Sequence, residues 1–255
     1  MKYKALVSDI DGTLMKQGNR ETTFSLPSTK VTEAIEKAKD LIHISLATSR
    51  PYKRMLHILD HLSLSGPTVI IDGAVIIDSV SREIIYKQLL DQNAVARIVE
   101  IIKKHNVVFN AFAENLEEVT TIEGLNQPLY NIFLAEFTEE KTIAVHKELN
   151  EITNISIHKV PSFNTSLWGL NVTDAHASKQ HGMLEIAKIL NIYPQEIIAV
   201  GDGYNDFPLL MSAGLKVAMG NAVDDLKAIA DYIAPSVDED GLAWVIEKFV
   251  LHNNI

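Results

Sequence analysis

The stretch Ala5-Leu6-Val7-Ser8-Asp9-Ile10-Asp11-Gly12-Thr13 decides the fold prediction. Residues 5–8 are a short, mostly apolar run that meets acids and a glycine, which is typical of a buried strand ending in a loop. Two residues apart in an extended segment, Asp9 and Asp11 point to the same side, where two carboxylates are costly unless a cation or proton intervenes. The Asp-Gly pair also suits a simple turn, so this stretch alone does not decide between turn and site.

The same rhythm recurs toward both ends of the chain. We expect strands at 42–47, 69–71, 197–200, 217–219 and 232–234, and helices at 28–40, from Pro51 onward, and at 179–190, 207–213, 223–230 and 242–250. Strands that alternate with helices predict an α/β fold, a Rossmann-like doubly wound parallel sheet.

The middle of the chain has a different pattern. Strand-like runs at 107–112, 129–137, 155–160 and 166–172 accompany only two helical stretches, 91–104 and 139–150. This pattern predicts an antiparallel sheet backed by two helices. We therefore predict a core of residues 1–83 and 176–255 with an inserted α+β domain at 84–175.

Composition narrows the function. The chain has 255 residues, 47% of them hydrophobic, a formal net charge of −10 and no cysteine. An acidic surface repels nucleic acid and anionic lipid, so we expect a small-molecule partner and neither nucleic acid nor membrane. The absence of cysteine excludes disulfides and zinc–thiolate sites. The first apolar run is too short for a signal peptide, and we expect a cytoplasmic protein. The oligomeric state stays open.

Polar clusters occur where the predicted strands end. Ligands bind outside the carboxyl ends of strands in open α/β sheets, so these clusters are candidate site residues. They are Asp9 and Asp11, Thr48 and Ser49, Asp72, and Asp202 with Asn205 and Asp206, joined by Lys179 at the start of a helix.

The segment Gly201-Asp202-Gly203-Tyr204-Asn205-Asp206 adds acids with no basic partner nearby in sequence. Magnesium typically binds one or two carboxylates together with substrate phosphate. The simpler interpretation is a helix cap, and Asn205 or Asp206 can fill that role even if Asp202 binds metal.

Other motifs fail. An EF-hand that starts at Asp9 needs Gly and Glu where the chain has Leu14 and Arg20. There is no G-x-x-x-x-G-K-[ST] loop and no G-x-S-x-G elbow, and a dinucleotide fingerprint would need glycine at Asp206.

Taken in order, Asp9-Ile10-Asp11-Gly12-Thr13-Leu14, Thr48, Lys179 and 201–206 resemble the four motifs of the haloacid dehalogenase (HAD) superfamily. The insertion resembles the large α+β cap of its Cof-like subfamily of sugar-phosphate phosphatases. The resemblance implies a magnesium-dependent phosphatase that acts on small phosphorylated metabolites. Alternatives are a sugar phosphomutase of the same family and a non-catalytic sugar-phosphate sensor.

By resemblance, Asp9 is the nucleophile that forms an aspartyl phosphate, and Asp11 is the general acid and base. Magnesium is held by the Asp9 carboxylate, the Asp11 backbone carbonyl and Asp202. Lys179 neutralises charge on the nucleophile and the phosphoryl group.

The remaining implied roles concern phosphate. Thr48 donates to a phosphoryl oxygen, the backbones of Ile10 and Ser49 add further donors, and Asn205 and Asp206 support the metal or phosphate. We expect cap segments 126–133 and 162–168 to contact the leaving group.

Two positions depart from the family pattern. Ala47-Thr48-Ser49-Arg50 stands where the family usually has A-T-G-R, and Asp72-Gly73 stands where it commonly has Asn-Gly. We expect Ser49 to stiffen its loop. We expect Asp72 to alter substrate preference or engage a cation.

Overall fold

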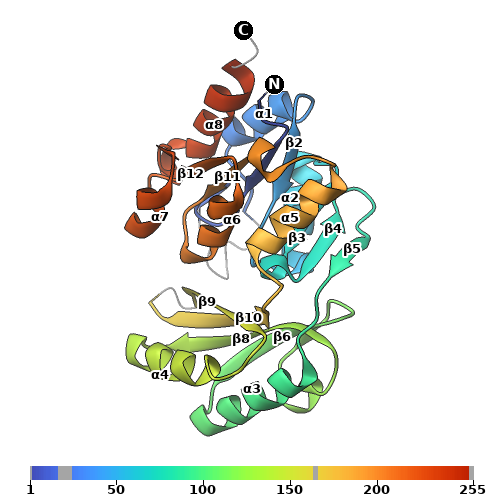
Figure 1. Cartoon of the computed structure of the whole chain (residues 1–255), viewed down its shortest axis with the longest axis vertical. Helices are drawn as coiled ribbons and strands as arrows, with labels where there is room; N and C mark the ends of the chain where they lie inside the picture. Colours follow the sequence, from blue (N-terminus) through green and yellow to red (C-terminus); the bar gives the residue numbers. More distant parts are fainter. Residues whose placement is uncertain (1, 17–24, 163–165, 253–255) are drawn as a thin grey trace.

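The structure is a computed structural model that describes residues 2–16, 25–162 and 166–252. Figure 1 shows a larger lobe built from both ends of the chain and a smaller lobe built from its middle. Each lobe has its own cluster of buried apolar side chains. The division at 83/84 and 175/176 stays a prediction.

A five-stranded parallel sheet forms the centre of the larger lobe, in the order β13-β12-β11-β1-β2. Its strands are β1 (Ala5–Ser8), β2 (His43–Leu46), β11 (Ile197–Gly201), β12 (Leu215–Ala218) and β13 (Tyr232–Ile233). All residues of β1 and β11 are buried, as expected for strands covered by helices on both faces. The predicted α/β class is confirmed.

Helices cover this sheet, and α1 packs against α8 while α5 packs against α6. Ser28 caps α1 by accepting the backbone N–H of Val31, and the predicted apolar face of that helix is buried. The helices of this lobe are α1 (Thr29–Ala38), α2 (Leu56–Leu62), α5 (Lys179–Ile189), α6 (Phe207–Ser212), α7 (Asp224–Ile229) and α8 (Gly241–Ile246), which a π-helical turn, Glu247–Leu251, extends.

The predicted strand at 69–71 exists as β3 (Pro67–Ile70), but a single parallel bridge joins it to the parallel sheet and its main pairing is elsewhere. It pairs antiparallel with β4 (Val75–Asp78), which pairs with β5 (Ile84–Lys87), and one bridge between Ala47 and Val69 links it to the chain after β2. The chain reverses because Ile71, Asp72 and Gly73 all have positive φ, which makes a tight turn. The helix expected from Pro51 begins as a 3₁₀ turn and becomes α2 only at Leu56.

The smaller lobe has an antiparallel sheet in the order β7-β6-β8-β10-β9, as predicted. One face packs on the two helices, with Ile132, Leu134, Leu170 and Val172 in the shared core. The elements are α3 (Gln92–His105), β6 (Val108–Ala113), β7 (Glu118–Val119), β8 (Leu129–Phe137), α4 (Glu139–Leu149), β9 (Ile155–Pro161) and β10 (Trp168–Asp174). The other face is directed toward the larger lobe (Figure 1).

Over the described ranges, none of the helices is both long and apolar enough to cross a membrane.

Candidate active site

The predicted site residues of the larger lobe gather at one edge of its sheet. β1 lies between β2 and β11 in parallel register, so the segments that follow all three strands leave the sheet on the same side. These segments carry Asp9, Thr48 and Asp202. Lys179 reaches the same edge from the first turn of α5.

Three carboxylates form the centre of the site. One oxygen each from Asp9, Asp202 and Asp206 lies within 4.8 Å of the others. The Lys179 ammonium, 1% exposed, donates to Asp9 Oδ1 at 2.5 Å and to Asp206 Oδ1 at 2.7 Å. One buried cation therefore faces three acids, and the cluster is short of positive charge.

Asp206 is fully committed to neighbouring donors. Its Oδ1 accepts from Lys179, and its Oδ2 accepts the backbone N–H groups of Asp202 and Gly203, each at 3.0 Å. It thus caps the turn that follows β11 and anchors the lysine. Asp206 therefore caps the 3₁₀ turn Tyr204–Asp206, whereas α6 has no side-chain cap. The predicted support of a metal or phosphate by Asp206 stays a prediction.

Asp202 is held more lightly. Its oxygens accept from the Thr13 hydroxyl at 3.2 Å and from the Asn221 amide at 3.3 Å. Gly12, at φ +89°, runs so close that a Cβ there would collide with the Asp202 carboxylate. Asn221 also donates to the Gly12 carbonyl at 2.9 Å and ties the two loops together. No local pattern in the sequence marks Asn221.

Burial governs the titration of these acids. It raises the pKa of Asp9 well above its ordinary value, with Asp206 and Asp202 adding to the rise and Lys179 opposing it. Burial and then Asp206 raise the pKa of Asp202 to about 7. Burial disfavours the charge of Lys179, but Asp206 and Asp9 outweigh it and raise its pKa.

The donors that remain suit a hard divalent cation. Asp9 and Asp202 offer carboxylate oxygens, the ligands that Mg²⁺ prefers, and a dication would offset the charge that Lys179 leaves unbalanced. The residues present therefore fit the metal that the motifs imply.

Asp11 is paired with Arg50. The guanidinium donates from Nε to Asp11 Oδ2 at 2.8 Å and from Nη2 to Oδ1 at 2.7 Å, a bidentate arrangement that fixes the carboxylate plane. Arg50 is 9% exposed and Asp11 30%. From the sequence, Arg50 was predicted to follow the second strand, and no function was predicted for it.

A sequence model of the haloacid dehalogenase-like hydrolases matches residues 6–124 and 113–246, which is most of the chain. The chain belongs to this family. The predicted enzyme class, a HAD-type phosphatase, is confirmed by the family and by the phosphatases among its relatives and structural neighbours.

Relatives from Bacillus subtilis include two named phosphatases. One, 28% identical over 97% of this chain and 96% of its own, is named 5-amino-6-(5-phospho-D-ribitylamino)uracil phosphatase YcsE. The other, phosphatase YwpJ, is 25% identical over 97% of this chain and all of its own.

Two solved structures share the whole architecture. The HAD subclass IIB sugar phosphatase BT4131 superposes with a TM-score of 0.80, at 26% identity over 96% of this chain and 98% of that one. The phosphatase BT1666 from Bacteroides thetaiotaomicron gives 0.81, at 25% identity over 97% and 95%.

The two departures from the HAD pattern contact each other. Ser49 Oγ donates to Asp72 Oδ1 at 2.6 Å, and the Asn205 amide donates to Ser49 Oγ at 3.0 Å and to Asp72 Oδ1 at 3.2 Å. The hydroxyl ties its loop to the turn after β3. Asp72 is fully buried, and both its oxygens accept hydrogen bonds from the protein.

Thr48 and Ile10 lie in the loops beside the acids. The Thr48 hydroxyl accepts the Arg50 backbone N–H at 3.1 Å and retains its own hydrogen for another acceptor. The Ile10 side chain is buried, and its carbonyl accepts the N–H groups of Thr13 and Met15. Their predicted phosphate contacts stay predictions.

Of the cap segments, 126–133 includes the buried Asn131, and part of 162–168 lies outside the described residues. Trp168 packs partly against the core of the cap, with the Lys159 ammonium 4.0 Å from the centre of its ring. This setting favours a role for Trp168 in packing of the cap over a role in stacking on a sugar.

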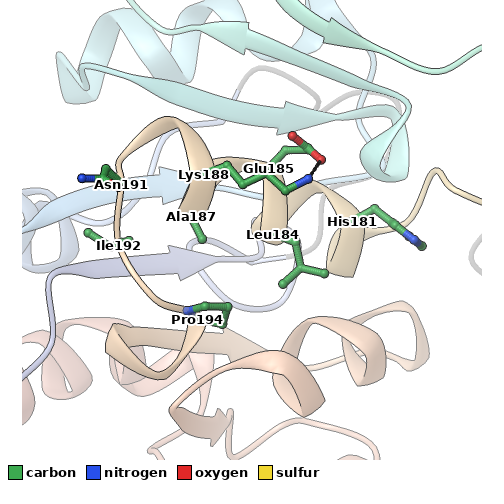
Figure 2. A pocket seen from close by; sticks show the side chains of 8 residues that line it. All are labelled: His181, Leu184, Glu185, Ala187, Lys188, Asn191, Ile192 and Pro194. Atoms are coloured by element: carbon green, nitrogen blue, oxygen red, sulfur yellow. Dashed lines mark hydrogen bonds and ion pairs between the residues drawn. The ribbon is translucent and has the colours of Figure 1, made fainter.

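A separate groove of about 440 Å³ runs along α5 (Figure 2). Its lining includes His181, Leu184, Lys188 and Pro194 and none of the predicted site residues. Lys188 pairs with Glu185 one turn away on the same helix. The groove offers no convergent donors for a phosphate, so we assign the chemistry to the strand ends.

Proposed function

We propose that the chain is a magnesium-dependent phosphatase that hydrolyses a small phosphorylated metabolite, a sugar or polyol phosphate, through an aspartyl phosphate on Asp9. The observation that carries this proposal is the buried lysine shared between Asp9 and Asp206, with Asp202 and Asp11 beside it. The names of the relatives support the substrate class, because one is a sugar phosphatase and another acts on a phosphoribityl compound.

The first half of the reaction transfers the phosphoryl group to Asp9. Lys179 holds Oδ1, so we assign the attack to Oδ2. As the new O–P bond forms, the bond to the leaving oxygen breaks, and Asp11 gives that oxygen a proton. Asp11 must carry this proton before the step, and each of its oxygens keeps a second lone pair beside the one that accepts from Arg50, so the fork can orient the acid while it is protonated.

The second half releases phosphate. Asp11 takes a proton from water, the water oxygen attacks phosphorus, and the bond to Asp9 breaks to regenerate the carboxylate. We assign to Lys179 and the Thr48 hydroxyl the offsetting of charge on the phosphoryl oxygens, which the contact of Lys179 with Asp9 supports. Asp9, the Asp11 carbonyl and Asp202 would hold magnesium, which supplies further positive charge to the phosphoryl group.

The proposal also covers the role of the cap and the setting in which the enzyme works. Residues 84–175 act as a cap that selects the leaving group. The net charge of −10 and the lack of cysteine support a cytoplasmic enzyme whose partner is a small molecule, not nucleic acid or membrane.

The test is phosphate release from p-nitrophenyl phosphate and a panel of sugar phosphates, polyol phosphates, nucleotides and pyridoxal phosphate, with magnesium or with chelator. We expect metal-dependent turnover that falls at least about 1,000-fold in Asp9→Asn. Isomerised product without phosphate release would show a mutase. A folded protein that binds magnesium and turns over nothing would contradict the proposal and favour a sensor.

A further inference from the structure

Asp72 connects the two lobes through a single buried carboxylate. It lies in the positive-φ turn after β3, in the larger lobe. Oδ1 accepts from Ser49 and Asn205, beside the candidate phosphate site. Oδ2 accepts from Asn171 Nδ2 on β10 of the cap at 2.6 Å.

An ionised carboxylate can only accept hydrogen bonds. Asp72 therefore determines which group donates and which accepts in the series of hydrogen bonds that runs from it into the cap. Burial opposes the charge of Asp72, but His158, Lys179 and the hydrogen bonds from Ser49 and Asn171 outweigh burial and lower its pKa. Asn171 must therefore turn its Nδ2 toward Asp72 and its Oδ1 away. That Oδ1 accepts from Asn131 Nδ2 at 2.7 Å, which leaves Asn131 Oδ1 at the end of the chain.

This series of hydrogen bonds ends at Asn131 Oδ1, a buried acceptor that receives no hydrogen bond from the described residues. Asn131 is 3% exposed, and its Oδ1 has no hydrogen-bond partner among the described residues. An unpaired buried acceptor is unfavourable and calls for an explanation.

The face of the cap sheet shows where this acceptor points. Ile132 and Val172 pack into the cap core, and side chains alternate along a strand, so Asn131 and Asn171 lie on the opposite face, toward Asp72. His158 lies across from Asn171 on β9, and its Nε2 is also buried without a partner in the described ranges. β9 packs against the turn that carries Asn205 and Asp206, so this face covers the site.

We infer that Asp72 fixes the hydrogen-bond direction across the closed site, so that Asn131 presents an acceptor and selects phosphate esters whose leaving group carries a hydroxyl donor. This inference rests on the proposed phosphatase function, because it concerns the leaving group of the same reaction. An amide at position 72 could donate as well as accept, and the direction of the chain would then be lost.

The test compares kcat/KM for the best sugar phosphate of the panel with its monodeoxy and mono-O-methyl analogues, position by position. Both analogues lose the donor, and the methyl ether keeps the acceptor. In the wild type we expect one position at which both analogues lose about 10- to 100-fold. The measured quantity is the ratio of kcat/KM for the parent ester to kcat/KM for its analogue at that position. Asn131→Leu should bring this ratio close to one, and Asp72→Asn, which is nearly isosteric, should reduce it several-fold. Asn115→Ala, an exposed cap residue, is the matched control and should keep the wild-type ratio.

The ratio within one variant cancels losses of overall activity or of folded protein. Equal ratios in wild type, Asn131→Leu and Asp72→Asn at every position would overturn the inference and leave the phosphatase standing. Turnover of p-nitrophenyl phosphate but of no hydroxylated ester would do the same. A wild type inactive on every ester, p-nitrophenyl phosphate included, would remove the proposed function and this inference with it.

Discussion

At the carboxyl ends of β1 and β11 the larger lobe presents charged groups, whereas the cap face above them presents neutral amides. Lys179 holds Asp9 and Asp206 in the first region, and Asn171 and Asn131 continue from Asp72 in the second. Charge suits the phosphoryl group, which is the same in every ester. Oriented neutral dipoles suit a leaving group, because they discriminate by donor and acceptor.

The strongest test of the charged region is Lys179→Met. It removes one ammonium and leaves two buried carboxylates unpaired, so we expect a loss of about 3–5 kcal/mol in the free energy of unfolding at neutral pH. Turnover should fall at least about 100-fold. Urea unfolding and phosphate release measure both effects.

Lys188→Met is the matched control, since Lys188 lies on the same helix and pairs with Glu185 at the surface. It should leave stability and turnover at wild-type values. A Lys179→Met protein as stable as this control would show that the acids do not depend on the buried lysine.

A smaller effect is expected at the edge of the charged region, from Arg50→Lys. Lysine keeps the charge but cannot hold both Asp11 oxygens in a fork, so kcat/KM for an alkyl phosphate should fall about 10- to 100-fold. The fall should be smaller with p-nitrophenyl phosphate, whose leaving group needs little protonation. Arg54→Lys, in the adjacent 3₁₀ turn, is the control. Equal losses on both esters would argue that Arg50 does not act through Asp11.

The metal response should depend on pH through Asp202. Its pKa of about 7 without metal exceeds the ordinary 3.8, so the folded protein holds a proton that the unfolded chain loses. Metal-free stability therefore falls as pH rises from about 4 to about 7, and magnesium must displace that proton.

We expect the magnesium-induced rise in Tm to be larger at about pH 8 than at about pH 6, with an affinity difference of about tenfold. Asp202→Asn should weaken this dependence, and what remains belongs to Asp9, whose pKa burial also raises. The same rise at both pH values would contradict the link between Asp202 and the metal.

The residues of the charged region could be predicted from the sequence far more readily than those of the neutral region. Apolar runs that stop at acids, as at Asp9 and Asp202, mark strand ends, and parallel topology brings them together. The bond between Asp72 and Asn171 joins residues 99 positions apart and has no local signal. The reversal after β3 depends on positive φ at Ile71 and Asp72, which side-chain patterns do not encode.

Some of the contacts that were not predicted do have a partial signal in the sequence. Asn171 stands between the apolar Leu170 and Val172 in a strand, and the polar Asn131 precedes the apolar Ile132 in the same way. Such alternation marks the face of a sheet turned away from its core. It predicts where an amide points but not which partner it meets.

The smallest expected effect tests whether the two departures from the HAD pattern form a unit that joins the regions. Ser49 donates to Asp72 at 2.6 Å, a short bond to a charged acceptor, so Ser49→Ala should cost about 1–3 kcal/mol in unfolding free energy. In an Asp72→Asn background the acceptor is neutral and the same change should cost less. A double-mutant cycle in urea should then give a coupling of at least about 0.5 kcal/mol. Strict additivity would mean that Ser49 and Asp72 act independently and do not form a unit that joins the charged and neutral regions.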